Sequence, residues 1–160
     1  LPLVVTAPTD MEARSDALYG AYLAGSALAV AGTALHHKLC HVLGGTFGLD
    51  HGEVNAVLLP YVAAFNAPAA SAALRDAAVA LGGDGSSATD TAARLRDLAV
   101  RLDLPLSLAA IGTPAEGLDT AARLAVDAVG SDNPRAVDAA SLHILLDDAY
   151  VGRWPTEGEA

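Results

Sequence analysis

Residues 34–66 read ALHHKLCHVLGGTFGLDHGEVNAVLLPYVAAFN, in which two largely apolar segments are separated by a glycine-containing stretch. Ala and Leu are frequent in it, and its first apolar segment is followed by Gly44 and Gly45, as is common where a helix ends. The stretch therefore predicts a helix over about 33–43 and a short loop over 44–50.

A second helix is predicted to begin directly after this loop. Asp50 and Glu53 have the spacing of an N-terminal capping box, which places His51 in the first turn of the helix. Pro60 has no backbone N–H to donate, so it is expected to interrupt and kink this helix.

The rest of the chain is predicted to be helical as well. Ala and Leu predominate and β-branched residues are few, so strand signals are weak. We expect an all-α fold, a bundle of about seven helices that forms one domain over residues 1–160. The remaining helices are expected over about 9–32 (after a capping box at 9–12), 69–81, 89–102, from Thr113-Pro114 onward, and 139–150.

Composition excludes several classes of protein. The chain has 160 residues and a formal charge of −10, from nine Lys and Arg against nineteen Asp and Glu. This balance argues against a nucleic-acid partner, whose binding would rest on neutralising phosphates. Cys40 is the single cysteine, so an intramolecular disulfide and a multi-cysteine zinc site are excluded. No secretory signal pattern is visible, and we expect a cytoplasmic location.

Two uncharged stretches, residues 17–35 and 54–74, are long enough to span a bilayer. The first consists mostly of small residues, and the second contains Pro60 and Pro68. We expect both to form buried core helices with no membrane partner, because a helix that is apolar all round is typical of a protein interior. Membrane association is the alternative.

Four of the five histidines lie within residues 36–51. His37 and His41 are four residues apart and share one helix face, and His51 follows a turn short enough to bring it beside them. Neutral imidazole is a good ligand for Zn²⁺ and Fe²⁺, so this grouping predicts a metal site. Ordinary structural histidines are the alternative.

The expected helix ends suggest different roles for two of these histidines. His51 lies at a helix N-terminus, where the partial positive charge favours the neutral ring that a metal requires. His41 lies in the expected last turn of its helix, where the protonated ring is favoured, as suits a group that passes protons on.

Three further residues have simpler expectations. Cys40 points away from the face shared by the two histidines and is expected to be buried packing rather than a nucleophile. Lys38, the only lysine, is expected either to be solvated or to contact an anionic substrate. His143, alone on the last helix, is expected to be structural.

Residues 34–66 resemble the metal-ligand region of the iron-containing alcohol dehydrogenase superfamily, and ALHHKLCHVLGGTF is most similar to its maleylacetate reductases. The resemblance covers nearly the whole chain. It extends to DMEARSDALYGAYLAGSALA (10–29), LRDLAVRLDLPLSLAAIG (95–112) and NPRAVDAASLHILLDDAYVGRWP (133–155). One departure is DHGE at 50–53, where maleylacetate reductases tend to have PHAE.

The resemblance implies an enzyme of two domains, of which this chain is the helical C-terminal one and lacks the N-terminal NAD(P)-binding α/β domain. It implies NADH or NADPH as cofactor, and either a bound Fe²⁺ or Zn²⁺ or, as in some maleylacetate reductases, no catalytic metal. It places metal ligands at His37 and His51, with an Asp and a His expected before Leu1. It places His41 near the nicotinamide and the substrate.

The activity that the resemblance implies is reduction of maleylacetate to 3-oxoadipate, a step in the degradation of aromatic compounds. We assign His41 as proton relay and cofactor contact, and Lys38 or His36 as partners for a substrate carboxylate. We expect a homodimer, and no activity from this chain alone. The alternatives are another alcohol dehydrogenase of the superfamily, acting on an alcohol or aldehyde, and a stand-alone helical metal-binding or interaction module.

Overall fold

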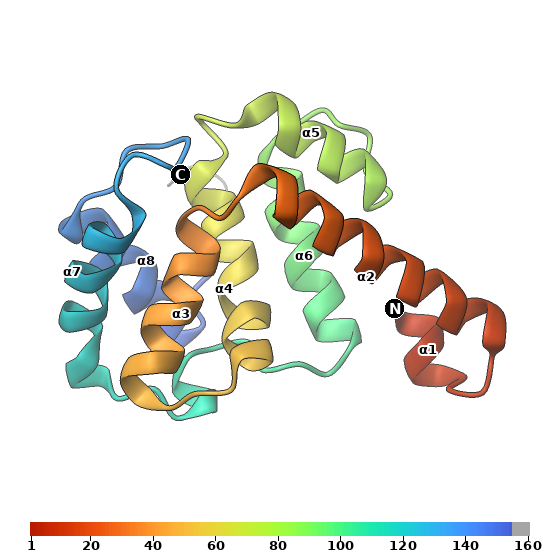
Figure 1. Cartoon of the computed structure of the whole chain (residues 1–160), viewed down its shortest axis with the longest axis horizontal. Helices are drawn as coiled ribbons and strands as arrows, with labels where there is room; N and C mark the ends of the chain where they lie inside the picture. The colour runs from red at the N-terminus through yellow and green to blue at the C-terminus, as the bar shows by residue number, and fades with distance from the viewer. Residues whose placement is uncertain (155–160) are drawn as a thin grey trace. The chain divides into compact units, whose positions relative to one another are not determined.

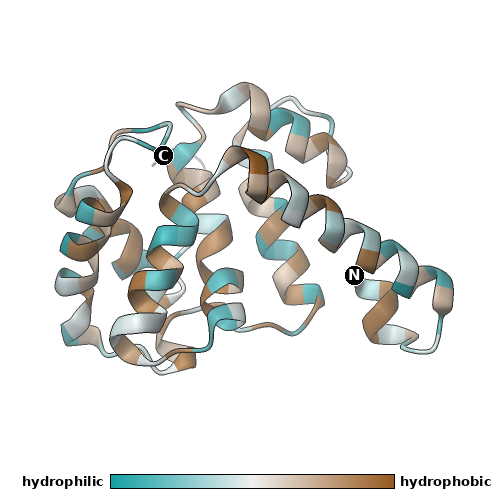
Figure 2. Ribbon diagram, in the orientation of Figure 1, coloured by the Kyte–Doolittle hydropathy of each residue, from teal (hydrophilic) through white to brown (hydrophobic). Residues whose placement is uncertain are grey.

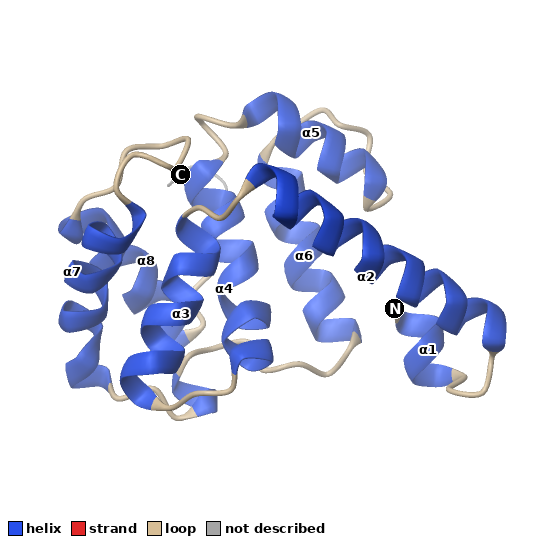
Figure 3. Cartoon of the chain, viewed as in Figure 1, coloured by secondary structure: helices blue, strands red, loops and turns tan. Residues whose placement is uncertain are grey.

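The computed structural model describes residues 1–154, and these contain helices and no strands (Figure 3). The predicted all-α fold class is therefore confirmed. The α-helices are α1 (Pro2–Thr6), α2 (Met11–Ala31), α3 (Leu35–Phe47), α4 (His51–Asn66), α5 (Ser71–Ala80), α6 (Thr89–Arg101), α7 (Leu118–Val129) and α8 (Ala139–Val151). Two short 3₁₀ helices, η1 (Ala109–Ile111) and η2 (Ala115–Gly117), precede α7. The short helix α1 is additional to those expected.

The chain divides into two compact units, Leu1–Thr33 and the part from Ala34 onward. In the first unit α1 packs against α2. The side chain of Asp10 caps α2 by accepting hydrogen bonds from the backbone N–H groups of Glu12 and Ala13 at 3.0 and 3.1 Å. The capping residue is thus Asp10 rather than Thr9, and the helix begins within a residue or two of its predicted start.

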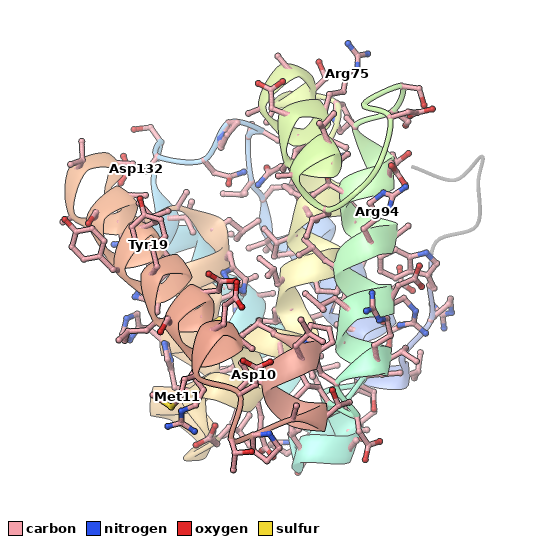
Figure 4. The ribbon with its side chains drawn as sticks, turned by 90° about the vertical axis from the view of Figure 1, so that its right-hand side faces the viewer. Asp10, Met11, Tyr19, Arg75, Arg94 and Asp132 are labelled. Atoms are coloured by element: carbon pink, nitrogen blue, oxygen red, sulfur yellow. The ribbon has the colours of Figure 1, made fainter. Side chains whose placement is uncertain are left out.

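The expectation that residues 17–35 form a buried helix is wrong for most of this stretch. Only Ala13 is buried among the residues of α2, and Figure 2 shows apolar residues along the length of this helix. Tyr19, labelled in Figure 4, stacks on Tyr22 with ring centroids 6.3 Å apart, and both are exposed. The reason is that the first unit has only the five residues of α1 to cover the 21 residues of α2.

In the second unit, α4 packs against α3, α6 and α8, and α7 packs against α3 and α8 (Figure 1). This arrangement encloses a core of leucine, valine and alanine side chains that have little or no exposure. Its members include Leu35, Leu39, Leu43, Val54, Leu58, Leu108, Ala121, Ala125, Leu142 and Leu146. The expectation of a buried helix is confirmed for α4, seven of whose residues are buried.

The leucines of α3 explain why its histidines point outward. Leu35, Leu39 and Leu43 recur every four residues, so they form one apolar stripe, and all three are fully buried. Positions 37 and 41 lie two residues further along, which is a rotation of about 200° around a helix of 3.6 residues per turn. Burial of the stripe therefore directs His37 and His41 away from the core.

Helix α3 ends later than predicted. It continues through Gly44 and Gly45 to Phe47 and ends at Gly48, whose φ of +68° is the left-handed conformation that glycine adopts most readily. The prediction of an end near residue 43 was wrong because the glycine with positive φ is the third one, not the first. The extra turn is held by Phe47, whose ring packs so closely on Gly117 that a Cβ there would clash.

Two other predicted boundaries change. Pro60 does not end its helix, because α4 continues to Asn66 with Pro60 buried inside it. Pro114 precedes η2, and α7 begins only at Leu118, so the proline is not its first residue. The predicted helices α5, α6 and α8 lie within about two residues of their observed bounds.

Within residues 1–154, no single helix is both long and apolar enough to cross a membrane. Helices α2 and α3 meet such a test only when they are taken as a pair across the break between them.

Candidate functional site

The structure brings together His37 and His41 of α3 and His51 of α4. Their ring centroids are 4.5 Å apart for His37 and His41, 5.5 Å for His37 and His51, and 5.3 Å for His41 and His51. The spacing of four residues stacks the first two one turn apart. The three-residue connection between α3 and α4 places the first residue of α4 beside them. We call these three residues the histidine cluster.

A hydrogen bond joins two members of this cluster. The Nε2 atoms of His37 and His41 are 2.9 Å apart, so one ring donates and the other accepts, and the accepting ring is neutral. Partial burial lowers the pKa of His37, and repulsion from His41, His51 and Lys38 lowers it further. The lowered pKa favours the neutral form of His37, which is the form that binds a metal or accepts a proton.

His51 lies in the first turn of α4, as predicted. The side chain of Asp50 caps this helix by accepting hydrogen bonds from the N–H groups of Gly52 and Glu53 at 2.9 and 3.0 Å. The cap fixes where α4 begins and therefore where the exposed His51 ring stands.

The position of His41 differs from its prediction. Because α3 continues to Phe47, His41 lies near the middle of the helix rather than in its last turn. The argument that the negative end of the helix favours a protonated His41 therefore does not apply, since that effect is confined to the last turn. What His41 retains is its exposed ring and its hydrogen bond to His37.

His36 points away from the histidine cluster and toward α4. Its Nε2 lies 3.2 Å from the backbone oxygen of Asn55 and 3.7 Å from Sγ of Cys40. A carbonyl oxygen can only accept, so Nε2 carries the proton and donates it to Asn55. Burial lowers the pKa of His36, more than the bond to Asn55 raises it.

The other candidate residues lie in three different environments. Lys38 is half-buried on α3, and in the described part of the chain no carboxylate lies within ion-pair distance of it. Cys40 is fully buried, and burial raises the pKa of its thiol to about 12, as expected of packing rather than of a nucleophile. His143 of α8 places Nδ1 3.0 Å from Oδ1 of Asp119 in α7, without the alignment of a hydrogen bond.

The histidine cluster fits a metal by its donor chemistry. Among residues 1–154 no three His, Cys, Asp or Glu side chains form a ready-made metal site. Two nitrogen ligands of one tetrahedral ion, each at about 2.0–2.1 Å, lie roughly 3.3 Å apart. The Nε2 atoms of His37 and His41 are 2.9 Å apart, which is close to this separation. Three imidazoles suit Fe²⁺ or Zn²⁺, and further ligands would be needed to complete the sphere.

Asn55 is a site residue that the sequence reasoning missed. Its Nδ2 donates to the backbone oxygen of His51 at 2.7 Å, and its own backbone oxygen accepts from His36. The signal available in the sequence is the spacing of four residues between His51 and Asn55, which places a side-chain amide one turn after the histidine.

Comparison with known proteins defines the class to which this site and fold belong. Residues 1–150 match the C-terminal part of the Fe-containing alcohol dehydrogenase family, and the chain belongs to this family.

Relatives and solved structures make the likeness more specific. The chain is 46% identical to a maleylacetate reductase of Sphingobium indicum over 97% of its own length, and 47% identical to one of Burkholderia cepacia over 93%. It spans only 42% and 41% of those two proteins. Maleylacetate reductase from Agrobacterium tumefaciens has a similar structure, with a TM-score of 0.87 and 44% identity over 96% of this chain and 42% of that one. An iron-containing alcohol dehydrogenase from Corynebacterium glutamicum has a TM-score of 0.88 and 42% identity, with the same coverage.

Proposed function

We propose that this chain is the helical C-terminal domain of an NAD(P)H-dependent oxidoreductase that reduces maleylacetate to 3-oxoadipate, in the degradation of aromatic compounds. In this proposal residues 1–160 form the domain, and an NAD(P)-binding α/β domain accompanies it in the intact protein. The observation that carries the proposal is the 46% identity to a maleylacetate reductase over 97% of the chain. The histidine cluster supports it as a site for the chemistry.

The reaction needs a hydride and a proton at neighbouring carbons. A bound NAD(P)H would supply the hydride to one carbon of the double bond that is conjugated to the ketone, and would leave as NAD(P)⁺. A proton then adds to the other carbon, so the developing enolate charge must be stabilised in between. A bound Fe²⁺ or Zn²⁺ would supply Lewis-acid polarisation of the carbonyl oxygen, and His37 and His51 are the residues that would hold it.

The remaining side chains handle protons and charge. His41 has an exposed ring that can take up and release a proton, which suits a proton relay beside the nicotinamide. Lys38 can place an ammonium group against a substrate carboxylate. His36 remains a second candidate for this contact through Nδ1, because its Nε2 already donates to Asn55.

The test is an assay of the intact protein with maleylacetate and either NADH or NADPH. We expect oxidation of the cofactor with maleylacetate and little with simple aldehydes, and a fall in kcat of about 100-fold or more in His37→Ala. His143→Ala is the matched control and should stay within about twofold of wild type. Full activity in His37→Ala would remove this residue from the mechanism. The isolated 160-residue chain, tested without the proposed NAD(P)-binding domain, should not oxidise the cofactor.

An alcohol or aldehyde substrate is the second candidate. The Gly52 position, where maleylacetate reductases tend to have alanine, favours it, as does the similarity to a solved 1,3-propanediol oxidoreductase with 28% identity and a TM-score of 0.85. Faster turnover of aldehydes than of maleylacetate in the same assay would establish this alternative.

We further propose that the intact protein is a cytoplasmic homodimer that acts on a small molecule and uses no nucleic-acid or membrane partner. The support for self-association is the exposed apolar surface of α2. Light scattering of the intact protein in solution checks it, since a mass of one subunit would rule the dimer out.

A further inference from the structure

Two consecutive hydrogen bonds connect α3 to the backbone of His51. The first runs from Nε2–H of His36 to the backbone oxygen of Asn55 at 3.2 Å. The second runs from Nδ2–H of Asn55 to the backbone oxygen of His51 at 2.7 Å. Asn55 thus accepts with its main chain and donates with its side chain. It joins a residue of α3 to the first residue of α4.

The surroundings of His36 hold its ring in the orientation that this link needs. Its neighbours on α3, Leu35, Leu39 and Cys40, are all fully buried. Cys40 lies one turn after His36 and places its sulfur 3.7 Å from Nε2, which limits rotation of the ring. Nε2–H of His36 is therefore held next to the backbone oxygen of Asn55 in α4.

Both ends of the link lie directly beside the histidine cluster. His36 precedes His37 in the chain, and Asn55 bonds to the backbone of His51 itself. The two hydrogen bonds therefore connect the backbone next to His37 with the backbone of His51, and the rings of these two residues lie 5.5 Å apart. A change in the contact between His36 and Asn55 would therefore change the distance between the two rings.

We propose that His36 is a positioning residue that sets His51 against His37 and His41 through Asn55. Residues next to metal-site ligands act in this way when they fix ligand orientation by hydrogen bonds, and their loss typically lowers metal affinity about 10- to 100-fold. The inference rests on the proposed function only in taking the histidine cluster as the working site.

The experiment compares His36→Leu with His36→Gln in the full 160-residue chain. Leucine removes the donor and keeps an apolar side chain of related size, whereas the glutamine amide can still donate to Asn55. The first readout is the nuclear Overhauser effect between the His37 and His51 rings, which needs no metal. The second is the dissociation constant for Co²⁺ added alone, followed by its visible absorption.

We expect His36→Leu to lose the ring-to-ring effect and to bind Co²⁺ at least about tenfold more weakly. We expect His36→Gln to retain both within about twofold, a rescue that loss of packing alone would not allow. His143→Leu makes the same substitution at the histidine of α8 and should leave both readouts unchanged.

Wild-type values for both readouts in His36→Leu would overturn the proposal. If the wild-type chain binds no Co²⁺, the ring-to-ring effect alone decides whether His36 positions His51. If His36→Leu does not fold, Asn55→Ala breaks the second bond of the link and leaves His36 in place. It should lose the same effect, and an unchanged effect in Asn55→Ala would also overturn the proposal.

Discussion

At the scale of residues, the neighbours His36 and His37 differ because consecutive positions on a helix are rotated by about 100°. His36 faces α4 and donates to Asn55, whereas His37 points outward and bonds to His41. One histidine is thereby committed to the contact between helices and the other to the site. The two neighbouring histidines therefore lie in different environments and make different contacts.

The reactivity of the Cys40 thiol tests whether this part of the core excludes solvent and reagents. Because burial raises the pKa of its thiol to about 12, we expect the native thiol to react with a disulfide reagent at least about 100-fold more slowly than in the urea-unfolded chain. The rate of release of the coloured thiol product measures this. Equal rates for native and unfolded chains would contradict burial.

The raised pKa of Cys40 also makes the free energy of unfolding depend on pH. The unfolded thiol titrates near its ordinary 9.0 and the folded one near 12, so the unfolded state loses its proton first. The free energy of unfolding should therefore be unaffected by this group below about pH 9 and should fall as the pH rises from 9 toward 12. Urea unfolding of wild type and Cys40→Ala over this range checks it, because the variant should lack this contribution to the pH dependence.

The cluster itself could be predicted from spacing, because His37 and His41 are one turn apart and the loop before His51 is short. Two details could not. The role of His41 was inferred from a helix end that lies at Phe47 rather than near residue 43. Asn55 could not be predicted as a site residue because its contact with His36 is made by its backbone oxygen, which every residue type has.

At the scale of elements, the end of α3 decides how far the histidine helix extends. Gly48 has a φ of +68°, and no other group lies within 4 Å of where a Cβ would be. We expect Gly48→Ala to lower the free energy of unfolding by about 1–2 kcal/mol, the cost of the left-handed conformation for an L-residue.

Gly45 is the matched position in the same helix. It lies inside α3 with open space at its Cβ, so Gly45→Ala should raise the free energy of unfolding by about 0.5 kcal/mol. Urea unfolding of both variants measures the two changes. Stabilisation by both substitutions would mean that the helix does not end at Gly48 in the left-handed conformation.

The starts of α4 and α8 could be predicted, whereas the end of α3 could not, and the reason is physical. Asp50 and Asp138 cap α4 and α8 with side-chain hydrogen bonds, which need a particular residue type at a particular place. The end of α3 was ambiguous because three glycines follow its first turns, and packing of Phe47 on Gly117 selects the last. That packing is tertiary, so local sequence could not reveal it.

At the scale of the whole molecule, burial was the property hardest to predict. Residues 54–74 and 17–35 are both uncharged, yet α4 is buried and α2 is exposed. The two stretches look alike because the local sequence shows how polar a helix is, but it does not show how many other helices pack against it. Helix α4 packs against α3, α6 and α8. In the first unit, only the short helix α1 packs against α2.

The exposed surface of α2 predicts that the isolated chain associates with itself. Leu18 and Tyr22 are 74% and 67% exposed on α2, and contiguous apolar surface of this kind favours association. We expect sedimentation to show a mass that rises with concentration, and we expect Leu18→Lys to shift the chain toward the monomer. Ile144→Lys, at a 63% exposed position of α8, is the matched control for added charge. If the control dissociates the chain equally, net charge governs association; if only the α2 variant does, the apolar surface of α2 is responsible.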